Sequence, residues 1–317
     1  MPLWIIIVQS VVQECFMATK SKKFRCWQNL TGEYDFAFEG NNLLVKVDMP
    51  YTFKWVQIVN EDNKDVFSKK YISKECKCDL KLTFGKYYIC LYSSKNGFIY
   101  DSYIGGKQIG IELDKNNNWG FILSEIFEIN RQLIVSGNID YLLSGTMLEN
   151  HHTIRRLASK LTINCRSLRE KVLSIHDFVA NNIYYDYDSL VSNENRYRTI
   201  AQIAQTKRCV CQGYADLTLV LLSCVGIEAE NILCYVVDNI YEHGWSDVKN
   251  RTSELNHIIT RVKLENRWLY MDVTWDSNNR YENGKYIKGN ISHRYFDVTL
   301  PFLSTTHRFF EKNKHNF

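Results

Sequence analysis

The residues best suited to catalysis lie in one short run, RCVCQGYAD at positions 208–216. Within it, Cys211 opens an apolar stretch that predicts a helix reaching to about Val225, just before Gly226. A cysteine at a helix start lies near the positive end of the helix dipole and the free N–H groups of the first turn, which stabilise a thiolate. The same N–H groups can face the oxyanion of an acyl-transfer reaction. Cys211 is therefore the candidate nucleophile, although a buried, inert thiol is the commoner role of a cysteine.

A nucleophilic cysteine needs a base, and the base needs a group that orients it. Two strand-forming runs flank Glu265 and Asn266, which predicts a hairpin with these two residues as its turn. This turn pairs Ile259 with Asp272 and makes His257 the diagonal neighbour of Asp272, roughly 7–8 Å away at Cα. A carboxylate among apolar strand residues requires a partner, and His257 can supply it. The hairpin therefore predicts a His–Asp pair, whose role is either catalytic or purely structural.

These residues together resemble a known family. The run CQGYA at 211–215, followed by a histidine 15 residues before DVTWD at 272–276, is similar to the transglutaminase-like superfamily, a papain-like group that uses a Cys-His-Asp triad. The run 170–186 resembles the helix that precedes the nucleophile in that family, and the YFD run at 295–297 also resembles it. The resemblance covers roughly residues 140 to 310.

The resemblance implies that Cys211 is the nucleophile, His257 the general base and Asp272 the residue that orients the imidazole. Cys209 is a rival nucleophile, but Cys211 is the cysteine followed by QGYA. Many relatives have AWN after the histidine, whereas this chain has IIT, so the local wall of the cleft differs. His243 is not expected to be the general base, because it lies 29 residues before Asp272 and outside any simple hairpin.

Further residues are candidates for lining the substrate cleft. They are Gln212, which follows the nucleophile, and the aromatic residues Tyr185, Tyr214 and Trp275. For each aromatic residue a buried position in the core is the alternative.

The elements that must position these residues predict an α+β fold. In the first part of the chain, strand-forming runs alternate with turn clusters and predict an antiparallel β-sandwich; the runs are 34–38, 43–47, 53–59, 80–84 and 87–92. After it, helical patterns cover 167–182, 200–205 and 211–225, and strand patterns cover 231–237, 257–264 and 267–274. The chain thus divides into a β-rich domain over 1–137 and a papain-like, transglutaminase-like domain over 138–317.

Composition excludes several classes of protein. The chain has 317 residues, 45% hydrophobic and 23% charged, which is typical of a globular protein. The net charge of +4 comes without a compact basic block, so no nucleic-acid partner is expected.

No apolar run reaches the roughly 18 residues of a membrane span. The first basic residue, Lys20, follows the N-terminal apolar run, so a signal peptide is not indicated. A cytoplasmic location is favoured, with secretion as the alternative.

The sequence predicts no cofactor and no metal. The ten cysteines are too dilute for a disulfide scaffold, and the Cys76–Cys78 and Cys209–Cys211 pairs have one intervening residue rather than the two to four of structural zinc sites. No phosphate-binding loop, dinucleotide fingerprint or nucleophile elbow is present.

The predicted function is thiol-dependent acyl transfer at an amide of a peptide or protein substrate. Hydrolysis, as in a cysteine peptidase or amidase, is preferred by analogy with the family. A protein-glutamine cross-linking transferase and a non-catalytic scaffold with an idle triad are the alternatives. The N-terminal domain is expected to bind a protein or a glycan.

Overall fold

The computed structural model describes residues 23–28, 34–47, 51–122, 125–142, 152–192, 197–236, 255–265, 267–304 and 306–312. The chain forms two compact units. Unit 1 comprises Met1–Val135, Val236–Thr252 and Thr299–Arg308, and unit 2 comprises Ser136–Tyr235, Ser253–Val298 and Phe309–Phe317. The chain first passes from unit 1 to unit 2 after Val135, near the predicted boundary at 137. It returns to unit 1 at Val236–Thr252 and again at Thr299–Arg308.

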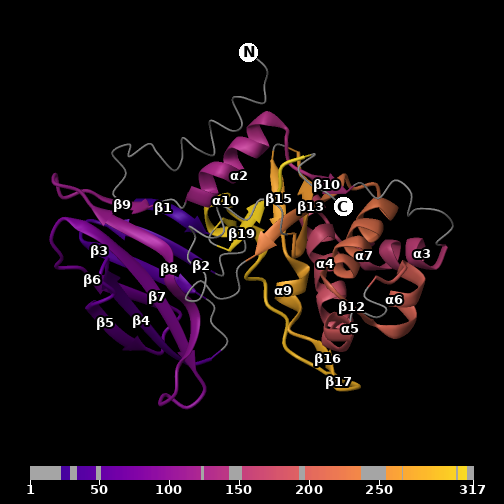
Figure 1. Cartoon of the computed structure of the whole chain (residues 1–317), viewed down its shortest axis with the longest axis horizontal. Coiled ribbons are helices and arrows are strands. Elements are labelled where there is room, and N and C mark those ends of the chain that lie inside the picture. The colour runs from indigo at the N-terminus through magenta and orange to yellow at the C-terminus, as the bar shows by residue number, and fades with distance from the viewer. Residues whose placement is uncertain are drawn as a thin grey trace. The chain divides into compact units, whose positions relative to one another are not determined.

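Unit 1 is built from two antiparallel sheets, drawn in indigo to magenta in Figure 1. Their strand orders are β1-β2-β3-β6 and β5-β4-β7-β8-β9. The first sheet consists of β1 (Lys23–Gln28), β2 (Tyr34–Glu39), β3 (Asn42–Val47) and β6 (Glu75–Asp79). The second consists of β4 (Phe53–Asn60), β5 (Asp65–Tyr71), β7 (Gly85–Ser94), β8 (Asp101–Leu113) and β9 (Trp119–Ile122).

Alternation of buried and exposed residues gives each sheet one apolar face. In β6, Cys76 and Cys78 are buried while their strand neighbours are exposed. The two sheets contact each other through apolar side chains, because the ring of Phe38 on β2 stacks on that of Trp119 on β9 with centroids 5.2 Å apart. The prediction of a strand at 80–84 is wrong, because β6 ends at Asp79 and residues 80–84 are irregular. Leu80, the first residue after β6, donates its N–H to the Asn41 carbonyl.

Unit 1 also contains the helices α2 (Glu125–Ser136, which extends one residue into unit 2) and α10 (Leu300–Leu303). The buried Asn130 of α2 donates from Nδ2 to the Ser304 hydroxyl and to the His307 carbonyl, both at 2.9 Å. Residues 299–308 are thus tied to a helix about 170 positions earlier in the chain.

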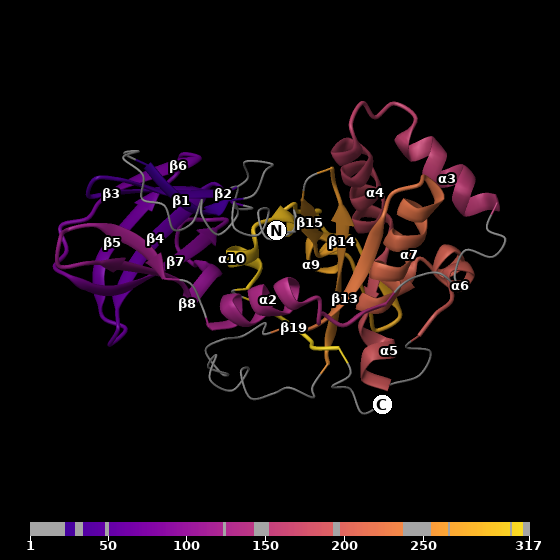
Figure 2. The same cartoon turned by 90° about the horizontal axis from the view of Figure 1, so that it is seen from above.

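Unit 2 centres on an antiparallel sheet of order β10-β13-β14-β15-β18. Its strands are β10 (Tyr141–Leu142), β13 (Ala229–Val236), β14 (His257–Lys263), β15 (Trp268–Met271) and β18 (Phe296–Val298). β14 is buried along almost its whole length. Figures 1 and 2 show the helices α3 (His152–Thr162), α4 (Leu168–Asn182) and α7 (Cys211–Cys224) gathered on one face of this sheet. The α+β class of the fold is confirmed.

The predicted hairpin is confirmed in its register. β14 and β15 are antiparallel, with Thr260 opposite Met271 and the Leu264 N–H bonded to the Arg267 carbonyl at 2.9 Å. This register brings Ile259 opposite Asp272, as the two-residue turn predicts. The structure differs from the prediction after Met271, because the strand ends there and the short helix α9 (Val273–Ser277) follows.

A smaller sheet of order β12-β11-β16-β17 completes unit 2, and its β11 pairs are parallel. Its strands are β11 (Tyr184–Asp186), β12 (Arg208–Cys209), β16 (Arg280–Glu282) and β17 (Lys285–Ile287). The remaining elements of unit 2 are α5 (Tyr187–Ser192) and α6 (Ile200–Thr206). The strand β19 (His307–Phe309) has two residues in unit 1 and one in unit 2.

Local signals fix the ends of the helices that carry the site. The Ser167 hydroxyl accepts the Glu170 N–H as the N-cap of α4. At the other end, the Asn279 side chain donates to the carbonyls of Ala180 and Ile183 at 2.9 and 3.0 Å. α7 is apolar around most of its circumference and is buried from Gly213 to Leu222, as expected of a central helix. None of the described helices is long and apolar enough to span a bilayer.

Candidate active site

Cys211 is the first residue of α7, as predicted, and its side chain is half-buried. The preceding residue, Val210, has an extended backbone and directs the chain from β12 into the helix. Close packing at Gly213 fixes this entry. A Cβ atom at Gly213 would lie 2.4 Å from Cys209 Cβ and 2.6 Å from its Sγ, so the first turn of α7 can approach β12 only through a glycine.

His257 and Asp272 form the predicted pair. His257 begins β14, Asp272 directly follows β15, and His257 Nε2 lies 2.8 Å from Asp272 Oδ2. Both side chains are buried. The other carboxylate oxygen of Asp272 accepts the Trp275 N–H at 3.1 Å, so Asp272 is also the N-cap of α9. The Asp272 N–H donates to the Tyr295 carbonyl, which holds the backbone of this residue as well.

The imidazole of His257 lies between the carboxylate and the thiol, because it is hydrogen-bonded to Cys211 as well as to Asp272. Burial by itself would lower the pKa of His257. The negative charge of Asp272 and the hydrogen bonds to Asp272 and Cys211 outweigh it and raise the pKa to about 10. At neutral pH the imidazole is therefore protonated.

A buried polar network behind this site was not identified from the sequence. Asp216, on α7, accepts hydrogen bonds from the Gln212 side chain and from Asn231 Nδ2, the latter at 3.1 Å. The Asn231 carbonyl oxygen in turn accepts the Thr260 hydroxyl at 2.9 Å. The network therefore links α7, which carries Cys211, to β13 and β14, which carries His257. Burial raises the pKa of Asp216 to about 6 although both hydrogen bonds act to lower it.

The predicted cleft residues lie in different environments. The half-buried ring of Trp275 lies beside His257, with ring centroids 5.7 Å apart. Gln212 is half-buried and engaged with Asp216. Tyr185 is half-buried on β11, where its ring contacts that of Tyr187.

Tyr214 has no exposed surface, and its hydroxyl is hydrogen-bonded to Ser277. Its side chain therefore belongs to the core rather than to a cleft, because its helical position turns it toward α9.

Cys209, the rival nucleophile, is fully buried. Burial raises the pKa of its thiol well above the ordinary value, which favours the neutral form. Cys90 and Cys234 are also buried. The eight cysteines whose side chains the structure describes are all free thiols. His243 lies outside the described residues.

A second group of ionisable side chains lies elsewhere in unit 2. His176, Asp177 and His293 offer ligand atoms that all lie within 4.8 Å of one another, a separation suited to a bound cation.

Comparison with known proteins places residues 155–273 in the transglutaminase-like superfamily, and this span includes Cys211, His257 and Asp272. The chain is 27% identical to kyphoscoliosis peptidase of Mus musculus over 124 residues, which are 39% of this chain and 18% of the mouse protein. The human kyphoscoliosis peptidase is 24% identical over 146 residues, 46% of this chain and 19% of that protein. The chain thus corresponds to less than a fifth of the length of these relatives.

Among solved structures, the periplasmic domain of TgpA from Pseudomonas aeruginosa is similar, at 14% identity and a TM-score of 0.30, covering 78% of this chain and 72% of that one. The match to the family rests on the sequence of the segment that carries the thiol and its two partners. The chain therefore carries, in residues 155–273, a domain of the transglutaminase-like superfamily.

Proposed function

We propose that this protein transfers acyl groups from amides through a covalent thioester on Cys211. The observation that carries the proposal is the hydrogen-bonded line from Cys211 through His257 to Asp272. A thiol, an imidazole and a carboxylate in this order supply a nucleophile, its base and the group that orients the base.

The chemistry follows from these contacts. The Cys211 sulfur attacks the carbonyl carbon of the amide, the C–N bond breaks, and the leaving amine takes a proton from the His257 imidazolium. In the second half, an acceptor adds to the thioester carbonyl, gives a proton to His257, and the C–S bond breaks to release the thiolate. Because Asp272 engages Nε2, we assign Nδ1 as the nitrogen that exchanges protons with the reacting groups.

The start of α7 supports stabilisation of the oxyanion. The first N–H groups of an α-helix have no acceptor within the helix. In α7 the Gly213 and Tyr214 N–H groups donate to the Val210 carbonyl, so we infer that the amides of Cys211 and Gln212 are the donors to the developing oxyanion. The ring of Trp275 beside His257 restricts water on that side of the imidazole.

We further propose that the acceptor is water, which makes the reaction a hydrolysis of a peptide or protein. The mouse and human relatives named as peptidases support this choice over an amine acceptor. An amine acceptor would give a cross-linking transferase with the same first half-reaction.

The test is to trap the acyl-enzyme by incubating the protein with a peptide library and analysing it by intact-mass and peptide-mapping mass spectrometry. We expect an acyl adduct on Cys211 that decays to a carboxylic acid in water, and none in a Cys211→Ala variant. If added primary amines were captured in preference to water, the transferase would be correct. Absence of any adduct, together with alkylation of Cys211 by iodoacetamide no faster than that of other accessible thiols, would support the non-catalytic scaffold.

A further inference from the structure

The family resemblance assigns no role to the adjacent residues His176 and Asp177 of α4, although they belong to a cluster of ionisable side chains inside unit 2. His176 is fully buried, and each of its ring nitrogens faces a carboxylate. Nδ1 lies 2.9 Å from Asp177 Oδ1, and Nε2 lies 3.1 Å from Asp276 Oδ2. A third group, His293, lies with its Nε2 2.6 Å from the same Asp177 Oδ1.

We propose that His176 Nδ1, Asp177 Oδ1 and His293 Nε2 form a binding site for a zinc ion. Two imidazole nitrogens and one carboxylate oxygen make a donor set that suits zinc. Around a tetrahedral zinc ion, ligand atoms about 2.0–2.1 Å from the metal are about 3.3 Å apart. The three ligand atoms here all lie within 4.8 Å of one another. The two imidazole nitrogens, at 2.9 and 2.6 Å from Asp177 Oδ1, need to move away from this oxygen by only a fraction of an ångström to admit the ion.

The surroundings of His176 support a metal site more strongly than the three ligands alone. A histidine that binds a metal through one nitrogen commonly donates from the other to a carboxylate, which fixes the ring and its tautomer. Asp276 occupies this position for His176, with a fully buried side chain. Asp276 is itself held, because it accepts the Ser292 hydroxyl at 2.5 Å and the Tyr295 N–H at 3.1 Å.

The site is also accessible from solvent on one side. The side chain of His176 is 0% exposed, whereas those of Asp177 and His293 are 36% and 26% exposed. An ion can therefore enter past Asp177 and His293 and keep water as its fourth ligand, while the fully buried ring of Phe296 packs against His176. The bound ion would join α4 to the segment before β18 in unit 2.

The test is equilibrium dialysis of the full chain against zinc, after removal of metal with a chelator, with bound zinc measured by elemental mass spectrometry. The Cys211→Ser background removes the reactive thiol as a competing ligand and makes the result independent of the proposed acyl transfer. We expect one zinc ion per chain, with affinity reduced at least tenfold by Asp177→Asn and by His293→Gln. Both substitutions affect partly exposed side chains, and circular dichroism verifies that each variant is folded.

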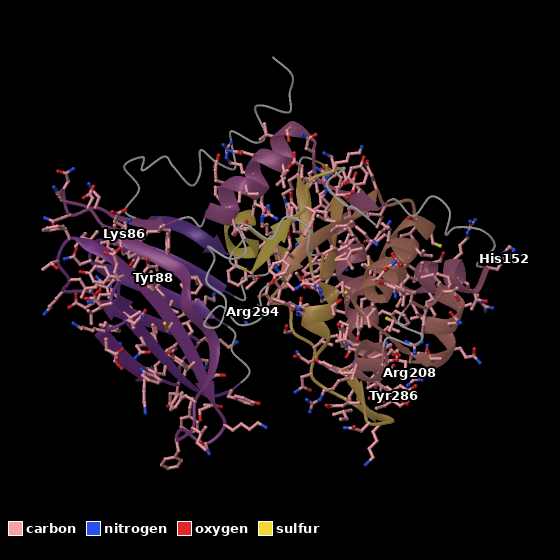
Figure 3. All side chains as sticks on the ribbon, in the orientation of Figure 1. Lys86, Tyr88, His152, Arg208, Tyr286 and Arg294 are labelled. Atoms are coloured by element: carbon pink, nitrogen blue, oxygen red, sulfur yellow. The ribbon has the colours of Figure 1, made fainter. Side chains whose placement is uncertain are left out.

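His152→Gln is the matched control. His152 is an exposed histidine of unit 2, and Figure 3 shows it far from Arg294, the residue that follows His293. We expect it to leave zinc binding unchanged. Cobalt provides the second readout: an ion held by nitrogen and oxygen lacks the thiolate charge-transfer absorption that binding to cysteines would produce. The proposal is overturned if the parent chain binds no zinc, if either folded ligand variant binds it as tightly as the parent, or if the cobalt spectrum shows thiolate ligation.

Discussion

At the scale of residues, the most consequential side chain is Asp272, because its two carboxylate oxygens make different interactions. Oδ2 engages His257 and Oδ1 caps α9 through the Trp275 N–H. Asp272→Asn keeps an oxygen for the cap but places an amide donor opposite His257 Nε2. This favours the tautomer that cannot accept a proton from Cys211. We expect kcat/KM to fall by 100-fold or more. The free energy of unfolding at neutral pH should also fall, because the buried imidazole loses its charged partner although the cap is kept.

The comparison variant for this prediction is Asp272→Ala, which removes both interactions and should additionally lose about 1 kcal/mol or more of stability. Steady-state kinetics on a cleaved peptide and urea unfolding of both variants measure the two effects separately. Equal stability of the two variants would show that the cap contributes nothing.

The protonation of His257 predicts a pH dependence of stability. Its pKa is raised to about 10 in the folded chain from about 6.5 in the unfolded chain. The stabilisation is therefore complete below about pH 6.5 and is lost as the pH rises through about 10. Relative to His257→Gln, the free energy of unfolding of the parent should fall between pH 7 and 10. Parallel curves from urea unfolding across this range would contradict the assigned ion pair.

At the scale of elements, the first turn of α7 depends on its close approach to β12. In an ordinary helix interior, glycine to alanine is favourable by up to about 1 kcal/mol. Gly213→Ala should have the opposite sign, because the new Cβ would overlap Cys209 and force α7 outward. We expect a loss of about 1–3 kcal/mol and slower alkylation of Cys211, two residues away.

Gly120→Ala on β9 is the control for Gly213→Ala, since a Cβ there would meet no atom within 4 Å. Urea midpoints and the rate of iodoacetamide labelling at Cys211 provide the two measurements. If Gly213→Ala behaved like Gly120→Ala in both, the close packing would not be the reason for the glycine.

The elements differ in how far the sequence could predict them. The β14–β15 register was predictable because a two-residue turn determines which residues lie opposite each other, and the His257–Asp272 contact follows from it. The end of the predicted strand at 274 was wrong because Asp272 caps a helix there. β5 and β6 were missed because charged residues on their exposed sides obscure the apolar alternation.

Contacts between distant segments could not be predicted from spacing. His293 meets Asp177 across 116 positions, and Asn130 meets Ser304 across 174. No turn or helical period relates such residues, so only the folded chain brings them together. The same holds for the Asp216–Asn231–Thr260 network, although a polar side chain in the apolar strand run at Asn231 was a usable signal.

At the scale of the whole molecule, the chain does not divide at one point. Unit 1 includes residues 299–308, whose Ser304 and His307 supply both acceptors of the buried Asn130 amide. The predicted cytoplasmic location and the predicted protein or glycan ligand of the N-terminal domain stay predictions.

A fragment of residues 1–137 should therefore fold less stably than unit 1 does within the full chain. It leaves the Asn130 amide without its acceptors, at a cost of about 1–3 kcal/mol, and it lacks the buried side chains of α10. Thermal melting followed by circular dichroism, with limited proteolysis, compares the fragment with the full chain. A cooperative transition of the fragment at the temperature of the β-rich unit in the full chain would contradict this.

The double use of Asp272 has a consequence for evolution. A descendant of this chain without the proposed reaction would still be selected to keep Asp272, because the carboxylate caps α9 whether or not an imidazole needs orienting. Cys211 is under no such constraint, since Val210 rather than Cys211 is the cap residue of α7 and the thiol side chain is only half-buried. In diverging lineages the aspartate should therefore outlast the cysteine. Loss of the thiol, rather than loss of the carboxylate, would therefore identify a copy that lacks the proposed catalysis.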